Sequence, residues 1–140
     1  MNGRTFVDTN ILLYAHDRDA GAKHQRARTV LQGLWETRTG VLSTQVLEEF
    51  YVNVTRKIPT PLPRHEARDL IRQYGVWDVI LLDGAMILEA SEIDERMKIS
   101  FWDALILVAA KKGRTSALLS EDFRHGQSFG DVVVRNPFLP

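Results

Sequence analysis

Acidic residues stand at several places where a folded chain could bring them together. Asp8 and Asp122 each follow an apolar run with the character of a strand. Asp103 lies near the start of an apolar helical segment, and Glu48 and Glu49 flank the apolar stripe of another. These two glutamates fall on opposite flanks of the stripe, so periodicity does not choose between them. Two carboxylates from strand ends and two from helices are therefore candidates for one acidic site.

Each of these positions also has a structural explanation. Asp8 can be an N-cap or turn residue for the segment 11–15, and Asp122 can be a turn or cap residue after its strand. Ser100 and Asp103 match a capping box, with the serine as N-cap. The helix that they open is nevertheless apolar nearly all round, and an acid in the first turn of a buried helix needs a partner or a metal ion.

The chemistry that clustered carboxylates favour is metal-assisted hydrolysis. Two unit negative charges about 5 Å apart repel by roughly 3 kcal/mol at an effective dielectric near 20, so such a cluster is costly without cations. A set of oxygen ligands without cysteine favours hard ions, Mg²⁺ or Mn²⁺, which also bind phosphate oxygens. A hydroxide on such an ion, attacking a phosphodiester, would be the corresponding reaction.

Alternating strands and helices supply the frame for such a site. Short apolar runs predict strands, and apolar stripes at helical spacing predict amphipathic or buried helices. A chain that begins with a strand and alternates in this way favours a mainly parallel sheet with helices on both faces and its active site beyond the carboxyl ends of the strands. The expected strands are 5–7, 40–42, 76–82, 117–119 and 132–134, and the expected helices cover 27–35, 44–57, 67–74, 86–97 and 102–112.

Length and composition fit one intracellular domain. The 140 residues, 44% of them hydrophobic, are enough for one core, and we expect a single domain over 1–140. The formal net charge is zero, so contact with RNA would have to be local. The absence of cysteine excludes disulfides and thiol catalysis and is compatible with the cytoplasm. We find no signal peptide and no apolar run long enough to span a membrane.

At these residues the sequence resembles the PIN-domain family, and most closely the VapC-like toxins of type II toxin–antitoxin pairs. The similarity spans nearly the whole chain and consists of five segments in the family's order. Any one of them could arise by chance, but the ordered set is specific. They run from Phe6 to Tyr14, from Leu42 to Phe50, from Ser100 to Ile106, from Leu119 to Phe123 and from Val134 to Phe138.

The resemblance implies a PIN-like three-layer α/β/α sandwich around a mainly parallel five-stranded sheet. It implies that Asp8, Glu49, Asp103 and Asp122 form the acidic quartet, because the family glutamate directly precedes the position of Phe50. Asp8, Glu49 and Asp103 would be the main metal ligands, and Asp122 would orient the ion or the attacking water.

The resemblance further implies an endoribonuclease that depends on Mg²⁺ or Mn²⁺ and leaves 5′-phosphate and 3′-hydroxyl ends. The hydroxyls of Thr9 and Ser120 match positions that support the pocket by hydrogen bonding. The family also implies a homodimer formed through helices and a cognate antitoxin protein that covers the acidic pocket.

Basic residues beyond the proposed catalytic helix and after Asp122 could hold RNA phosphates. The alternative is that the lysines face the helix dipole at the carboxyl end of that helix. The candidates are Lys111, Lys112, Arg114 and Arg124. The three tryptophans lie in apolar patterns, so we expect Trp35, Trp77 and Trp102 in the core or at an interface.

Other classes of small α/β protein fit less well. A receiver-like signalling module should show paired acids after the first strand, but here Asp8 is followed by Thr9 and Asn10. A phosphatase of the haloacid dehalogenase type needs a second aspartate at the position of Asn10. A PIN nuclease that processes RNA without a toxin role stays open, and a neighbouring antitoxin gene would distinguish it.

Overall fold

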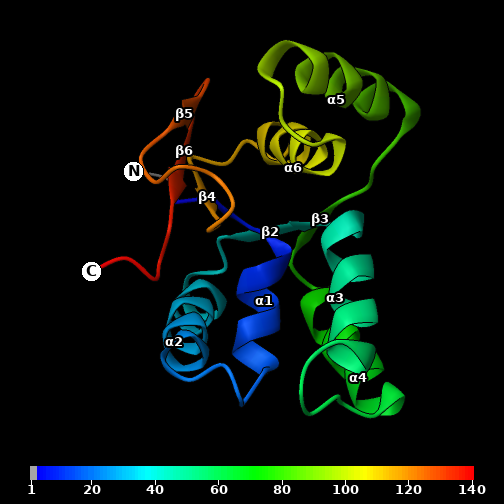
Figure 1. The fold of residues 1–140 in the computed structure, drawn as a ribbon, viewed down its shortest axis with the longest axis vertical. Coiled ribbons are helices and arrows are strands. Elements are labelled where there is room, and N and C mark those ends of the chain that lie inside the picture. The colour runs from blue at the N-terminus through cyan, green and yellow to red at the C-terminus, as the bar shows by residue number, and fades with distance from the viewer. Residues whose placement is uncertain (1–2) are drawn as a thin grey trace.

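A six-stranded sheet runs through the middle of the molecule, and helices cover both of its faces (Figure 1). The computed structural model describes residues 3–140. The strands are β1 (Thr5–Val7), β2 (Gly40–Ser43), β3 (Asp78–Ile80), β4 (Ala117–Leu119), β5 (Ser128–Phe129) and β6 (Val132–Arg135). The helices are α1 (Thr9–His16), α2 (Ala22–Thr37), α3 (Thr44–Arg56), α4 (Arg64–Tyr74), α5 (Gly84–Met97) and α6 (Phe101–Lys112).

The strand order is β3-β2-β1-β4-β6-β5, with all neighbours parallel except the pair of β5 and β6. The first strand in the chain is therefore central. Val7, at the end of β1, pairs with Leu119, at the end of β4. The carboxyl ends of these two strands are level, so the residues that follow them, Asp8 and Ser120, come out side by side.

The expectation of five strands is wrong by one, because β5 forms an additional antiparallel edge. Its two residues pair with β6 across a tight hairpin in which Phe129 lies opposite Val132. Gly130, at the first loop position, has a φ of +60°, which glycine adopts without strain. A two-residue strand is too short to produce a periodic pattern. The third strand is also shorter than expected, because Val76 and Leu81 on either side of it are exposed.

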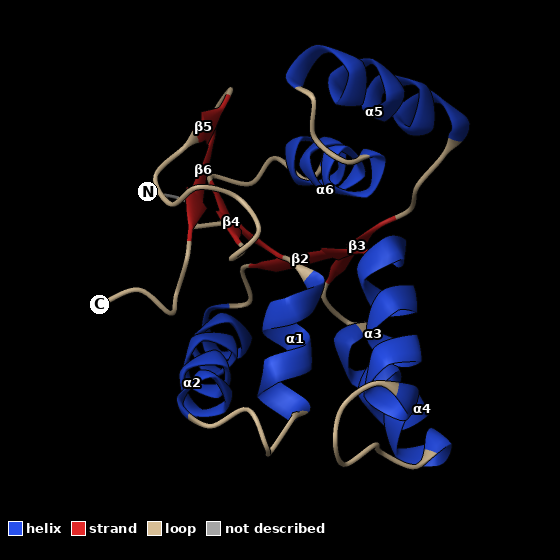
Figure 2. Ribbon diagram, in the orientation of Figure 1, coloured by secondary structure: helices blue, strands red, loops and turns tan. Residues whose placement is uncertain are grey.

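The helices form two layers, which makes the molecule a three-layer α/β/α sandwich (Figure 2). Helices α5 and α6 pack together on one face, and α1 to α4 cover the other. Helix α6 is buried from Ala104 to Ala110, as its apolar sequence predicts. No helix among residues 3–140 is both long enough and apolar enough to cross a membrane.

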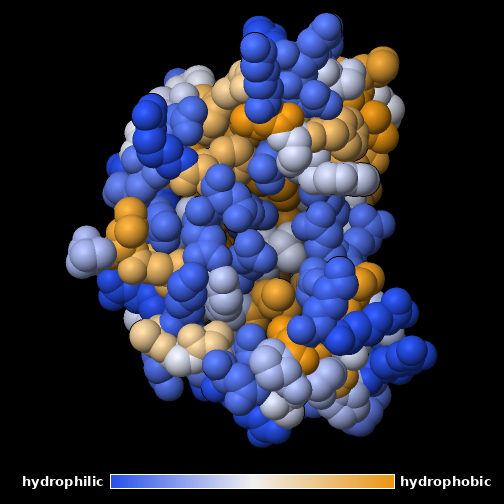
Figure 3. Space-filling model, in the orientation of Figure 1, coloured by the Kyte–Doolittle hydropathy of each residue, from blue (hydrophilic) through white to orange (hydrophobic). Residues whose placement is uncertain are grey.

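The tryptophans differ in burial. Trp35 and Trp77 are half-buried against the core and pack edge to face with ring centroids 5.1 Å apart. Trp102 differs, because 60% of it is exposed at the start of α6. Figure 3 shows a mainly hydrophilic face with apolar patches between the polar side chains. The exposed apolar residues also include Ile87 and Leu88 on α5.

Candidate active site

Asp8 lies at the carboxyl end of the central strand and caps helix α1. Its backbone is extended, and its Oδ1 atom accepts a hydrogen bond of 2.7 Å from the Thr9 amide. Its Oδ2 atom accepts one of 2.8 Å from the Ser120 hydroxyl, which follows β4. The capping explanation of Asp8 is therefore correct, and the carboxylate nevertheless reaches across to the next strand. Only 4% of Asp8 is exposed.

The environment of Asp8 disfavours its charged form. Burial raises the pKa of Asp8 to about 7, and the negative charges of Asp122 and Asp103 contribute to this increase. The hydrogen bonds from Ser120 and Thr9 lower the pKa but do not cancel the effect of burial. A positive charge beside Asp8 would favour its ionised form.

Glu49 faces the same end of the sheet from helix α3. The Thr9 hydroxyl donates a hydrogen bond of 2.6 Å to Glu49 Oε1, and the Gln45 amide donates one of 3.2 Å to Oε2. Glu48, its neighbour, is exposed. Of the two glutamates that periodicity left open, Glu49 is thus the one that contacts the residues around Asp8.

Asp103 lies in the first turn of α6, where its amide donates a hydrogen bond of 3.0 Å to the N-cap Ser100. Burial raises the pKa of Asp103, and so does the charge of Glu49. The Gln45 amide also donates to the backbone oxygen of Trp102 at 3.3 Å. One glutamine side chain therefore connects the helix that carries Glu49 to the helix that carries Asp103.

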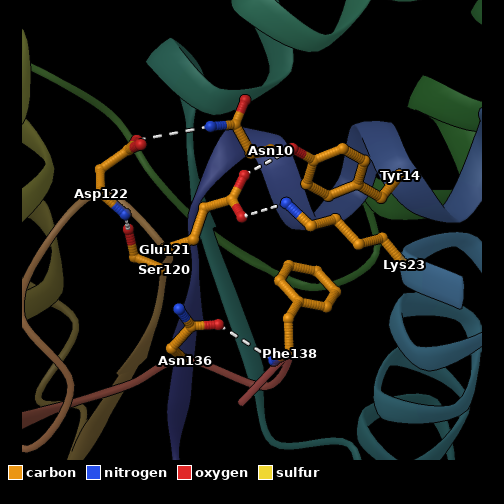
Figure 4. A network of polar contacts seen from close by, with 8 residues as sticks. All are labelled: Asn10, Tyr14, Lys23, Ser120, Glu121, Asp122, Asn136 and Phe138. Atoms are coloured by element: carbon orange, nitrogen blue, oxygen red, sulfur yellow. Dashed lines mark hydrogen bonds and ion pairs between the residues drawn. The ribbon is translucent and has the colours of Figure 1, made fainter. Parts of the chain in front are cut away.

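Asp122 belongs to the loop after β4. Its amide donates a hydrogen bond of 3.0 Å to the Ser120 hydroxyl, and its Oδ2 atom accepts one of 3.4 Å from the Asn10 side chain (Figure 4). Burial raises the pKa of Asp122, followed by the charges of Asp103, Glu121 and Glu49. Asp122 and Asp103 thus act on Asp8, and Glu49 acts on Asp103 and Asp122, so the expected quartet is electrostatically connected.

The donor chemistry of this site suits a hard divalent cation. Its carboxylates come with hydroxyl and amide neighbours and no sulfur, the combination that Mg²⁺ and Mn²⁺ prefer. Gln45 Oε1, beside Glu49, is buried, and among residues 3–140 no other buried side-chain oxygen or nitrogen lacks a hydrogen-bond partner. Within the same residues, no three acidic or histidine side chains already surround one point as a ready ligand set.

Most of the proposed RNA-binding residues lie away from the carboxylates. Lys111 and Lys112 occupy the last turn of α6, about 12 to 14 Å along the helix from Asp103 at 1.5 Å per residue. Arg114 follows them, at the end of the sheet where the Arg4 side chain donates to the Gly113 oxygen. These residues lie at the end of the sheet opposite the carboxylates, because α6 runs antiparallel to the strands.

Arg124 is the exception, since it is exposed in the same loop as Asp122. Asn10 and Gln45 also contact the carboxylates, and neither was predicted from the sequence as a site residue. Asn10 adjoins Asp8 and Thr9, and Gln45 stands one helical turn before Glu49, the spacing at which helical side chains meet. That spacing was the available signal for Gln45.

The chain matches a protein family over most of its length. The model of the PIN domain family matches residues 5–127. No curated protein sequence matches the chain significantly.

Solved structures share the fold. VapC20 of Mycobacterium tuberculosis, a toxin that cleaves the sarcin-ricin loop, has a TM-score of 0.64 and 23% identity, with 81% of this chain and 86% of that chain covered. A toxin–antitoxin complex from Klebsiella pneumoniae has a TM-score of 0.69 and 19% identity, with 96% of this chain and 98% of that chain covered. VapBC2 from Rickettsia felis, bound to a DNA fragment from its promoter, has a TM-score of 0.64 and 17% identity, with 94% of this chain and 97% of that chain covered. The family match over residues 5–127 shows that this chain belongs to the PIN domain family.

Proposed function

We propose that this protein is a metal-dependent endoribonuclease that hydrolyses RNA phosphodiester bonds. The observation that carries the proposal is the gathering of Asp8, Glu49, Asp103 and Asp122 at the carboxyl edge of the sheet, where burial and mutual charge raise the pKa of three of them. Clustered negative charges destabilise a folded protein unless cations bind to them. Enzymes commonly have carboxylates with shifted pKa values in their active sites.

The proposed roles follow from these positions. Asp8, Glu49 and Asp103 would hold a divalent cation, Mg²⁺ or Mn²⁺, and Asp122 would orient it or the attacking water. When bound, the cation would neutralise charge on the scissile phosphate and make water more acidic. Thr9 would keep Glu49 in place through its hydroxyl.

Ser120 has the corresponding role for the strand-end aspartates. It donates its hydroxyl hydrogen to Asp8 and accepts the amide hydrogen of Asp122, so one oxygen sets the relative position of both residues. Preorganised groups of this kind contribute to catalysis by removing the need to reorganise during the reaction.

We further propose that the protein is the toxin of a VapBC-type pair, with an antitoxin protein as partner and a homodimer as the active assembly. Its fold is shared by one toxin and by chains from two toxin–antitoxin complexes, which supports this assignment by analogy. Coexpression with the product of an adjacent small gene, followed by copurification and growth measurements, would test the partner.

The direct test is cleavage of a mixed RNA pool by purified protein with Mg²⁺, with Mn²⁺ and with EDTA. We expect metal-dependent cutting that leaves 5′-phosphate ends and that Asp103→Asn abolishes without unfolding the protein. Asp131→Asn, the same chemical change at an exposed position, is the matched control. Full activity of Asp103→Asn, or equal activity in EDTA, would refute the proposal.

A further inference from the structure

Glu121, the neighbour of Asp122, is held from two sides. Its Oε1 atom accepts a hydrogen bond of 2.5 Å from the Tyr14 hydroxyl, and its Oε2 atom accepts one of 2.8 Å from the Lys23 ammonium (Figure 4). The Glu121 side chain is 19% exposed and that of Lys23 is 44% exposed. Both oxygens of this carboxylate are thus occupied by groups from α1 and α2, and the side chain points toward them.

The ammonium of Lys23 is itself held by aromatic rings. It lies 4.9 Å from the ring centroid of Tyr14 and 5.3 Å from that of Phe138, distances at which a cation is attracted to a ring face. The two rings pack edge to face with centroids 5.3 Å apart. Phe138 belongs to the last residues of the chain, where its amide donates to the Asn136 side chain (Figure 4).

Helix α1 contacts two successive residues of the loop. Asn10 donates to Asp122, and Tyr14, one helical turn later, donates to Glu121. The bond from Asn10 is long at 3.4 Å, so this side chain holds Asp122 weakly. The charged contact of Lys23 with Glu121, at 2.8 Å, is shorter and stronger than this bond from Asn10.

We propose that Lys23, Tyr14 and Phe138 form a clamp on Glu121 that positions Asp122 in the carboxylate site. The Lys23 ammonium also offsets part of the negative charge that Glu121 brings near Asp122. These residues are positioning residues for the nuclease, and their catalytic effect rests on the proposed function.

The test removes single parts of the clamp. Lys23→Met deletes the charge but keeps a long side chain, Tyr14→Phe deletes one oxygen, and Lys23→Arg retains a cation. Arg72→Met, which breaks the exposed Asp69–Arg72 ion pair on α4, is the matched control. The first measurement is hydrogen–deuterium exchange of the peptide covering residues 120–127, with and without Mg²⁺.

We expect exchange in this peptide to become about fivefold faster in Lys23→Met and Tyr14→Phe, while β1 keeps its protection. Lys23→Arg should restore most of the protection, and Arg72→Met should leave it unchanged. In the cleavage assay, the kcat of the first two variants should fall about fivefold or more at an unchanged KM for RNA.

Unchanged exchange and unchanged kcat in both Lys23→Met and Tyr14→Phe would overturn the clamp. If Lys23→Met loses protection throughout the chain, Tyr14→Phe decides, because it changes a single oxygen. If the wild-type protein does not cut RNA, the proposed function fails while the exchange measurement still decides whether the clamp orders the loop.

Discussion

The Ser120 hydroxyl donates a hydrogen bond to Asp8 across 2.8 Å, although the two residues are 112 positions apart in the chain. Parallel pairing of β1 with β4 brings them together, since Val7 lies opposite Leu119. Both residues are almost completely buried, so water does not compete for this contact. The bond therefore connects the stability of the sheet edge to the geometry of the candidate site.

Ser120→Ala should destabilise the protein and slow cleavage. It removes the hydrogen bonds that Ser120 makes with Asp8 Oδ2 and with the Asp122 amide, which we expect to cost about 1–3 kcal/mol in the free energy of unfolding. Urea unfolding in EDTA measures this cost. Ser116→Ala, at a half-buried serine at the other end of β4, is the control, and an equal loss in both variants would contradict a special role of Ser120.

The contribution of Asp8 to the stability of the metal-free protein should fall as the pH rises. The pKa of Asp8 is about 7 in the folded chain against an ordinary value of 3.8, so between these values the folded state binds a proton that the unfolded state has released. The loss begins near pH 4 and is complete above pH 7, and the full difference corresponds to about 4 kcal/mol.

Thermal unfolding in EDTA at pH 4.5, 6 and 8 measures this dependence. Asp8→Asn carries no titrating group at this position, so its Tm should rise relative to that of the wild type as the pH increases and should exceed it at pH 8. Adding Mn²⁺ at pH 8 should raise the Tm of the wild type more than that of Asp8→Asn. Parallel pH curves for the two proteins would show that Asp8 does not titrate in this range.

Thr9→Val should reduce cleavage while preserving the fold. Valine has nearly the same shape but cannot donate the 2.6 Å hydrogen bond to Glu49. Because removal of a partner that orients a ligand typically costs 10- to 100-fold in activity, we expect kcat to fall by about that factor. Thr9→Ser keeps the hydroxyl and should retain most activity. Equal activity in the wild type and both variants would show that the Thr9 hydroxyl does not support catalysis.

Gly40→Ala should destabilise the fold at a distance from the carboxylates. A Cβ atom at this position would come within 2.2 Å of the Trp77 ring, so the ring would have to move. Overpacking of this kind costs about 1–3 kcal/mol. Gly33→Ala is the control, because a methyl group there meets nothing within 4 Å and should stabilise helix α2 by about 0.5–1 kcal/mol. Both free energies come from urea unfolding.

The sequence was sufficient to predict the layers and the main strands. A helix that is apolar nearly all round, such as α6, is stable only when it is buried in the core. The apolar runs of β1 and β4 must likewise be buried on both faces of the sheet. The additional strand β5 escaped prediction, because two residues and a glycine turn carry no periodicity.

The candidate site was only partly predictable. Glu48 and Glu49 are equivalent on a helical wheel, and the tertiary contact with Thr9 distinguishes them. Lys111 was expected near the pocket because it belongs to the same helix as Asp103. That helix runs antiparallel to the strands, so Lys111 lies at the opposite end of the sheet from the carboxylates. Contacts such as that of Lys23 with Glu121 depend on how distant segments pack, and a single sequence carries no local signal for them.

The central position of β1 governs when a growing chain can acquire the site. This strand is synthesised first, but one of its two neighbours, β4, is made after more than a hundred further residues. Asp8 therefore emerges long before Ser120 and Asp122 exist, and pairing between segments so distant in sequence is slow to form. A nascent or truncated chain that ends before β4 has no complete carboxylate site, so any nuclease activity belongs to the finished molecule.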